Sequence, residues 1–72
     1  MLFELPRAAT VRLEVFDMQG RLVRAVEESF EPGVRSLVWD RRTTSGEYAP
    51  RGVYPIRVSA GSERANGRLT VR

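Results

Sequence analysis

The sequence lacks three residue types that carry much of protein chemistry, because it has no cysteine, no histidine and no lysine. Without cysteine the chain cannot form a disulfide, a thiolate nucleophile or a zinc–sulfur site. Without histidine it lacks the commonest general base and the commonest transition-metal ligand. Its serine hydroxyls therefore have neither histidine nor lysine to activate them as nucleophiles. These absences predict a protein that is not an enzyme and that carries no cofactor.

The acidic residues do not supply a catalytic pair or a metal site in place of the missing residue types. Glu27 and Glu28 are neighbours on an expected strand, so their side chains point to opposite faces and cannot act jointly on one substrate. Asp17, Asp40 and Glu47 lie at expected turns, but Ca²⁺ needs about six to eight oxygen ligands, usually from a dense acidic loop. We expect the aspartates to cap turns and predict no metal site.

Length and charge limit the remaining functions. The 72 residues suffice for one small domain with a simple core, and no apolar run is long enough to span a membrane. The formal net charge is +3, and all 12 basic residues are arginine, with 9 acidic residues interleaved among them. This scatter favours a solvated surface over the clustered basic patch that is typical of a nucleic-acid interface.

Apolar and polar residues alternate with a period of two along most of the chain. Val11, Leu13 and Val15 alternate with Arg12 and Glu14, which indicates a strand buried on one face. Further strands are expected over residues 21–27, 34–40, 53–60 and 64–72, and residues 40–51 are expected to form a polar loop. Five or six short strands joined by hairpins predict a sandwich or a small barrel.

Four residues carry more specific expectations. Asp17 and Gly20 fit the first and fourth positions of a type I turn, which would join the first two strands into a hairpin. Trp39 is expected to lie in the core between two sheets, with an exposed stacking platform as the alternative. Pro55 cannot donate a ladder hydrogen bond, so its strand is expected to lie at a sheet edge or to carry a bulge there.

The turn and strand residues also fall in the order of a known family. The motifs are Leu5-Pro6, Val11-x-Leu13-x-Val15-Phe16-Asp17-x-x-Gly20-Arg21-x-Val23, Pro32-Gly33, Leu37-x-Trp39-Asp40, Ser45-Gly46, Gly52-Val53-Tyr54-x-x-Arg57-Val58 and Arg68-Leu69-x-Val71. With them the chain resembles the Ig-like domain of the bacterial flagellar hook-capping protein. It is equally similar to related Ig-like modules at the C-termini of exported bacterial proteins, including type IX secretion sorting domains.

The chain departs from the family pattern at two places. Arg41-Arg42-Thr43-Thr44 stands where the family usually has a small or acidic residue and further acids. Pro55 stands where the family favours a bulky apolar residue. The first departure argues against a cation-binding role for this loop.

The resemblance implies an all-β fold, namely a small antiparallel immunoglobulin- or fibronectin III-like β-sandwich of about six to seven short strands. Residues 1–72 would form this single domain, excerpted from a longer protein with its first strand cut short. The implied function is a noncatalytic module for sorting, anchoring or assembly of a larger exported or cell-surface protein, located in the periplasm, outside the cell or on its surface. Its partners would be other domains of that protein, or secretion or surface machinery, with neither nucleic acid nor membrane insertion. The shortened strand would leave a sheet edge open to self-association.

The candidate residues form three groups. The expected structural core comprises Leu13, Val15, Leu37, Trp39, Tyr54 and Val58. The expected structural turns depend on Asp17, Gly20, Gly33, Asp40, Gly46 and Gly52. The candidate partner contacts are the basic and aromatic residues in or beside the long loop, Arg41, Arg42, Tyr48 and Arg51, which could bind a phosphate or a carboxylate-rich partner. An ordinary solvated loop is the alternative for this third group.

A small basic β-barrel that binds single-stranded nucleic acid is the alternative function. Its size, strand number and charge would suit this chain. Such proteins, however, place several aromatic and basic residues on one sheet face. The aromatic residues here are dispersed along the sequence, which favours the noncatalytic module.

Overall fold

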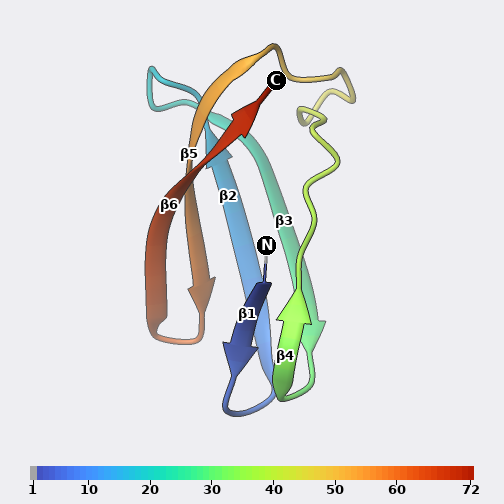
Figure 1. The fold of residues 1–72 in the computed structure, drawn as a ribbon, viewed down its shortest axis with the longest axis vertical. Coiled ribbons are helices and arrows are strands. Elements are labelled where there is room, and N and C mark those ends of the chain that lie inside the picture. Colours follow the sequence, from blue (N-terminus) through green and yellow to red (C-terminus); the bar gives the residue numbers. More distant parts are fainter. Residues whose placement is uncertain (1) are drawn as a thin grey trace.

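The computed structural model describes residues 2–72, which form six antiparallel strands and no helix. The strands are β1 (Leu2–Leu5), β2 (Ala9–Phe16), β3 (Leu22–Phe30), β4 (Gly33–Ser36), β5 (Gly52–Ala60) and β6 (Glu63–Val71). One sheet has the order β3-β2-β5-β6, and the other pairs β1 with β4 (Figure 1). The predicted small antiparallel β-sandwich is therefore confirmed. The larger sheet ends at β3 and β6 without closing, so the fold is not a barrel.

The alternation in β2 produces the buried face of the larger sheet. Val11, Leu13 and Val15 are almost fully buried, because successive side chains of a strand point to opposite faces. Leu13 pairs with Val26 of β3 on one side and with Val58 of β5 on the other. This strand thus has a ladder on both sides and supplies the centre of the core.

The β2–β3 hairpin depends on the turn predicted from Asp17 and Gly20. The Gly20 N–H donates to the Asp17 carbonyl at 3.0 Å, and Gly20 has a φ of +84°. One Asp17 carboxylate oxygen also accepts from the backbone N–H groups of Gln19 and Arg21, both at 2.9 Å. The same carboxylate forms an ion pair with the Arg21 guanidinium at 3.0 Å. These bonds lower the pKa of Asp17 below its ordinary value of 3.8, with the Arg21 backbone N–H as the largest cause, partly offset by burial.

The second layer is joined to the larger sheet through side chains. Phe3 of β1 packs edge-on against Phe30 of β3, with ring centroids 5.2 Å apart. Trp39 contacts Tyr54 of β5 in the same manner at 5.6 Å. In Figure 1, β1 and β4 lie in front of β2 and β3, while β5 and β6 lie to one side. The second layer therefore covers the larger sheet unevenly.

The predicted strand over residues 34–40 is wrong in its second half. Strand β4 ends at Ser36, and residues 37–40 belong to no strand. The alternation of burial nevertheless continues, since Leu37 and Trp39 are 3% and 8% exposed while Val38 is 76% exposed. The sequence pattern thus predicted correctly which side chains are buried, although residues 37–40 form no strand.

The expectation for Pro55 is also wrong, because β5 lies between β2 and β6 inside the larger sheet. No register shift occurs in either ladder of β5. Pro55 pairs with Arg68 of β6, but the pairing with β2 stops one residue away, at Ile56. The proline is tolerated within an interior strand because it lies beyond the end of one ladder.

Candidate functional site

The structure separates the predicted core residues into two levels of burial. Five of them are buried, namely Leu13, Val15, Leu37, Trp39 and Tyr54. Val58 is only half-buried and packs against the margin of this cluster. It lies on β5, where the second layer leaves the larger sheet less covered (Figure 1). Val58 therefore lies at the margin of the core.

Two core aromatic residues fasten the long loop to the sandwich. The Trp39 indole N–H donates to the Arg42 carbonyl at 3.0 Å. The Tyr54 hydroxyl donates to the Pro50 carbonyl at 2.6 Å. Both side chains therefore bury apolar rings while their polar atoms bind the loop main chain, the arrangement expected of buried tryptophan and tyrosine.

A third attachment joins the middle of the loop to β3. The backbone N–H and the hydroxyl of Thr44 both donate to the Val23 carbonyl, each at 3.0 Å. The Arg24 guanidinium donates weakly to the Thr43 carbonyl at 3.4 Å. These bonds, with those of Trp39 and Tyr54, make the loop a bound part of the second layer.

Arg42 and Tyr48, two of the predicted partner contacts, bind each other. The Arg42 guanidinium carbon lies 4.2 Å from the centroid of the Tyr48 ring. Its nitrogens donate to the Tyr48 hydroxyl at 2.9 Å and to the Gly46 carbonyl at 2.8 Å. The Arg42 donors and the Tyr48 ring thus hold the loop in shape, which leaves them less suited to a partner than the sequence indicated.

The other two predicted contacts, Arg51 and Arg41, take no part in that interaction. Arg51 is an exposed residue immediately before β5. Arg41 has a φ of +65° and lines a groove between the second layer and β6. The four residues therefore do not act as one cluster.

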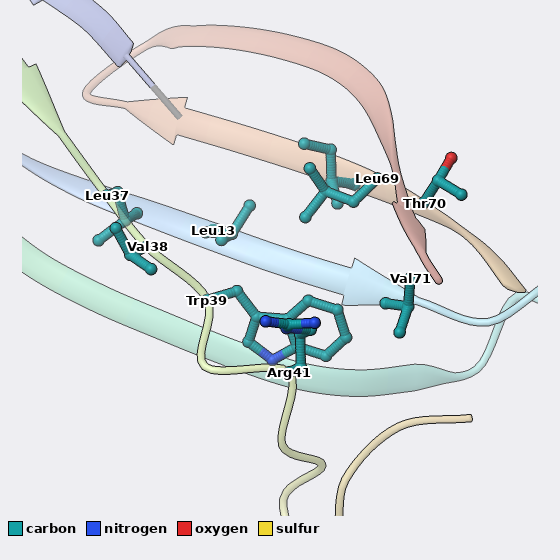
Figure 2. A pocket seen from close by; sticks show the side chains of 9 residues that line it. Leu13, Leu37, Val38, Trp39, Arg41, Leu69, Thr70 and Val71 are labelled. Atoms are coloured by element: carbon teal, nitrogen blue, oxygen red, sulfur yellow. The ribbon is translucent and has the colours of Figure 1, made fainter. Parts of the chain in front are cut away.

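This groove on the described surface was not predicted from the sequence. Residues 37–39 form one wall, residues 69–71 of β6 form the other, and Leu13 and Ile56 contribute to its floor. Its volume is about 230 Å³. Figure 2 shows these side chains, with Arg41 drawn across the Trp39 indole. Only the meeting of segments far apart in the sequence creates it.

The outer face of the larger sheet carries an ion-pair network across β3, β2 and β5. Arg12 lies 3.6 Å from Glu14 and 3.4 Å from Glu27, and Arg57 lies 3.9 Å from Glu14. These pairs are solvated, so each contributes at most about 1 kcal/mol to stability. The charges neutralise one another and leave this face without a concentrated field.

Among the predicted turn residues, Asp17, Gly20, Asp40 and Gly46 occupy turns and loops, whereas Gly33 and Gly52 are the first residues of β4 and β5. Asp40 accepts a hydrogen bond from the Arg42 N–H at 3.0 Å. Positive φ angles occur at Gly20, Gly33, Gly46 and Gly52. Gly52 has a φ of +156° and opens β5, where a side chain would be strained. These residues shape the fold, and none of them faces the groove.

The described part of the chain contains no group of three or more histidine, cysteine or acidic residues placed to hold a metal ion. It also contains no helix long and apolar enough to cross a membrane.

Comparison with known protein families gives a match over almost the whole chain. The family model described as the FlgD Ig-like domain matches residues 1–70. No curated protein matches the chain. The match covers almost the full length and agrees with the resemblance seen in the ordered sequence motifs.

Proposed function

We propose, from the premise that the chain belongs to the FlgD Ig-like domain family, that it is an assembly module of a flagellar hook-capping protein. The family is one of noncatalytic structural domains. The module would contact other parts of the protein that contains it, and that protein would act outside the cytoplasm. Membership over residues 1–70 is the observation that carries this proposal.

The way the chain uses its polar groups supports a structural role. Trp39, Tyr54 and Arg42 direct their donors to loop carbonyls. Arg12, Glu14 and Arg57 are engaged in the network on the outer face. These hydrogen-bond donors and charged side chains are thus engaged within the domain. A partner would therefore recognise the domain mainly by its shape.

Deletion in the native host tests this role against sorting and anchoring. The coding region for residues 1–72 would be removed in frame, and hooks would be counted by electron microscopy while the parent protein is followed by immunoblotting of cell fractions. An assembly module predicts a parent protein that is still exported, together with few or no completed hooks. Retention of the parent inside the cell would indicate a sorting module instead, and normal hooks would overturn the proposal.

A matched variant separates assembly from loss of folding. Arg51→Ala changes an exposed residue that lies outside the groove, so it should leave both export and hook number unchanged. Trp39→Ala should reproduce the deletion, because it removes a core residue that holds the loop. If Trp39→Ala unfolds the purified domain and hooks remain normal, assembly does not depend on this module.

A further inference from the structure

The larger sheet ends at two strands that each have one open side. Among the described residues, β3 pairs only with β2, and β6 pairs only with β5. Figure 1 shows these two strands on opposite sides of β2. The long loop binds β3 near its beginning, through the bonds from Thr44 to the Val23 carbonyl. Residues 25–30 of β3 and the whole of β6 therefore keep an edge on which a further strand can pair.

The two edges carry opposite charges. The β6 edge presents Arg64 and Arg68, which are exposed and form no ion pair with a described residue. The β3 edge presents the exposed carboxylates of Glu27 and Glu28, and Glu31 follows directly after the strand. Across a ladder, opposite charges are stabilising and like charges are destabilising. Pairing of β6 with β6, or of β3 with β3, is therefore opposed, whereas pairing of β6 with β3 is favoured.

A second copy in the same orientation presents its β3 to β6 in the correct direction. The three ladders of the larger sheet are all antiparallel, so β3 and β6 of one copy run in opposite directions. A neighbour that is shifted sideways without being turned over therefore aligns its β3 antiparallel to β6. The outer faces of the two sheets then lie on the same side, and the ladder continues from one copy into the next.

The charged residues of the two edges lie on the same face of the sheet. Residues directly opposite each other in a ladder share a face. Glu27 lies opposite Arg12, which lies opposite Ser59. Ser59 in turn lies opposite Arg64 at the other edge. Arg68 is four residues after Arg64 on the same strand, so it points to this face as well.

The spacing of the charges defines a register for this pairing. Glu27 and Glu31 are four residues apart, and so are Arg64 and Arg68. An antiparallel pairing can therefore place Arg68 of one copy opposite Glu27 of the next, and Arg64 opposite Glu31. This register uses the part of β3 that lies beyond the attachment of the long loop.

The same register suits the inner face of the sheet. It places Val26 opposite Leu69, and both are half-buried residues at the margin of the core, so their contact would bury further apolar surface. Glu28 falls opposite Gly67, which has no side chain to obstruct it. Glu63, the acidic residue at the start of β6, lies beyond the last pair. Both faces are therefore compatible with one alignment of the two strands.

We propose that the domain binds a second copy of itself, with β6 of one copy paired to β3 of the next. Cross-strand ion pairs between the arginines of β6 and the glutamates at β3 select this pairing over that of like edges. The contact joins two different surfaces and does not close on itself, so further copies can add at both ends. This self-association goes beyond the hook-assembly role and does not rest on it, because it depends only on the two edges of the domain.

Sedimentation velocity of the 72-residue chain over a range of concentrations tests the contact. We expect larger species that increase with concentration and that dissociate at high salt, because salt screens exposed ion pairs. Amides of β6 that have no partner in the single copy should exchange more slowly in the associated state. A chain that stays monomeric up to about 1 mM, the range of weak association, would overturn the proposal.

Two charge-reversed variants test which edges pair. The first carries Arg64→Glu and Arg68→Glu, so both of its edges present glutamate on the outer face. The second carries Glu27→Arg and Glu31→Arg, so both of its edges present arginine there. Each variant alone should associate at least about tenfold more weakly than the parent. An equimolar mixture should associate again, because acidic β6 then meets basic β3, and a mixture that stays monomeric would contradict the pairing.

A matched variant separates the edges from net charge. Arg7→Glu combined with Arg51→Glu makes the same change in net charge as the first variant, at exposed residues outside both edge strands, and should associate like the parent. Circular dichroism melts establish that each variant is folded. If a double variant melts early, the single changes Arg68→Glu and Glu27→Arg give the same two tests. Equal loss of association in the matched variant would mean that the proposal is wrong.

Two other arrangements give different results. If another segment of a longer parent chain covers either edge, a chain extended by about ten residues, the length of a long strand, will stay monomeric, which overturns the proposal. If like edges pair, association will stop at a dimer and one of the two charge-reversed variants will still associate alone, with the same consequence. Neither result bears on the hook-assembly experiment, so failure of the self-association is distinguishable from failure of the proposed function.

Discussion

The two layers of this domain are held together by different interactions. The larger sheet has strands of 8 or 9 residues, and its central strand β2 is paired on both sides. The second layer has two strands of 4 residues and then a long segment without a ladder. That segment depends on Trp39, Tyr54 and Thr44, whose side chains bind main-chain carbonyls.

This difference explains how a short chain can form a sandwich and still leave a groove uncovered. Two-stranded ribbons are marginally stable on their own in water, so the second layer must be stabilised by its contacts with the larger sheet. It does so at a few points and leaves the groove uncovered. Loss of a single hydrogen bond at those points should therefore affect the second layer first, whereas loss of a large core side chain should affect the whole domain.

The largest effect is expected from Trp39→Ala. This change removes a large core side chain and the hydrogen bond to the Arg42 carbonyl, so it should cost about 3–5 kcal/mol. A small domain has a total stability of the order of 5 kcal/mol, and urea unfolding should show the variant largely unfolded. Val38→Ala, at the exposed neighbouring residue, is the control and should change stability by less than about 0.5 kcal/mol. Unchanged melting of Trp39→Ala would mean that the second layer does not depend on this side chain.

Gly20→Val tests the β2–β3 turn, where the larger sheet depends on unusual backbone geometry. A side chain at Gly20 would meet no atom within 4 Å, so the cost comes from the backbone alone and should be about 1–2 kcal/mol. Gly20→Asn should cost less, since asparagine tolerates positive φ. Equal melting temperatures for the two variants would indicate that the turn relaxes to ordinary angles.

Tyr54→Phe should have a smaller effect that is local to the second layer. It keeps the ring against Trp39 but leaves the Pro50 carbonyl without its donor at 2.6 Å. The expected loss is about 0.5–1.5 kcal/mol, with faster amide exchange in residues 40–51 and little change in β2. An equal increase of exchange throughout β2 would contradict the separation of the two layers.

The smallest effect concerns pH and the Asp17 turn. The folded state lowers the pKa of Asp17, so its contribution to stability is present above the unfolded value of 3.8 and is lost as pH falls through the lowered folded value. Asp17→Asn should melt lower than the parent at neutral pH, and this difference should shrink well below pH 3.8. Thermal melts across this range measure it, and a constant difference would contradict the assignment.

The sequence predicted the larger sheet better than the second layer for a physical reason. In β2, the alternation of Val11, Leu13 and Val15 coincides with real ladders on both sides. In residues 37–40 the same alternation persists without a ladder, because burial requires only a facing core. The pattern could not distinguish these two cases.

The candidate contact residues show the same limit. Arg42 and Tyr48 are basic and aromatic as a binding surface requires, yet they bind each other and Gly46. Arg41 lines the groove only because residues 37–39 and 69–71 meet in space. The local sequence gives no signal of that contact. Pro55 likewise depends on where β2 stops pairing with β5.

Native-state amide hydrogen exchange tests the division between the two layers most directly. We expect the paired amides of β2 and β5 to exchange together at the rate of global unfolding, and the hydrogen-bonded amides of Thr43, Thr44 and Ala49 to exchange faster through local opening. Dilute urea should accelerate the first group strongly and the second group weakly, since local opening exposes less surface. If all these amides share one rate and one urea dependence, the domain opens as a single unit and the second layer is not a separately held part.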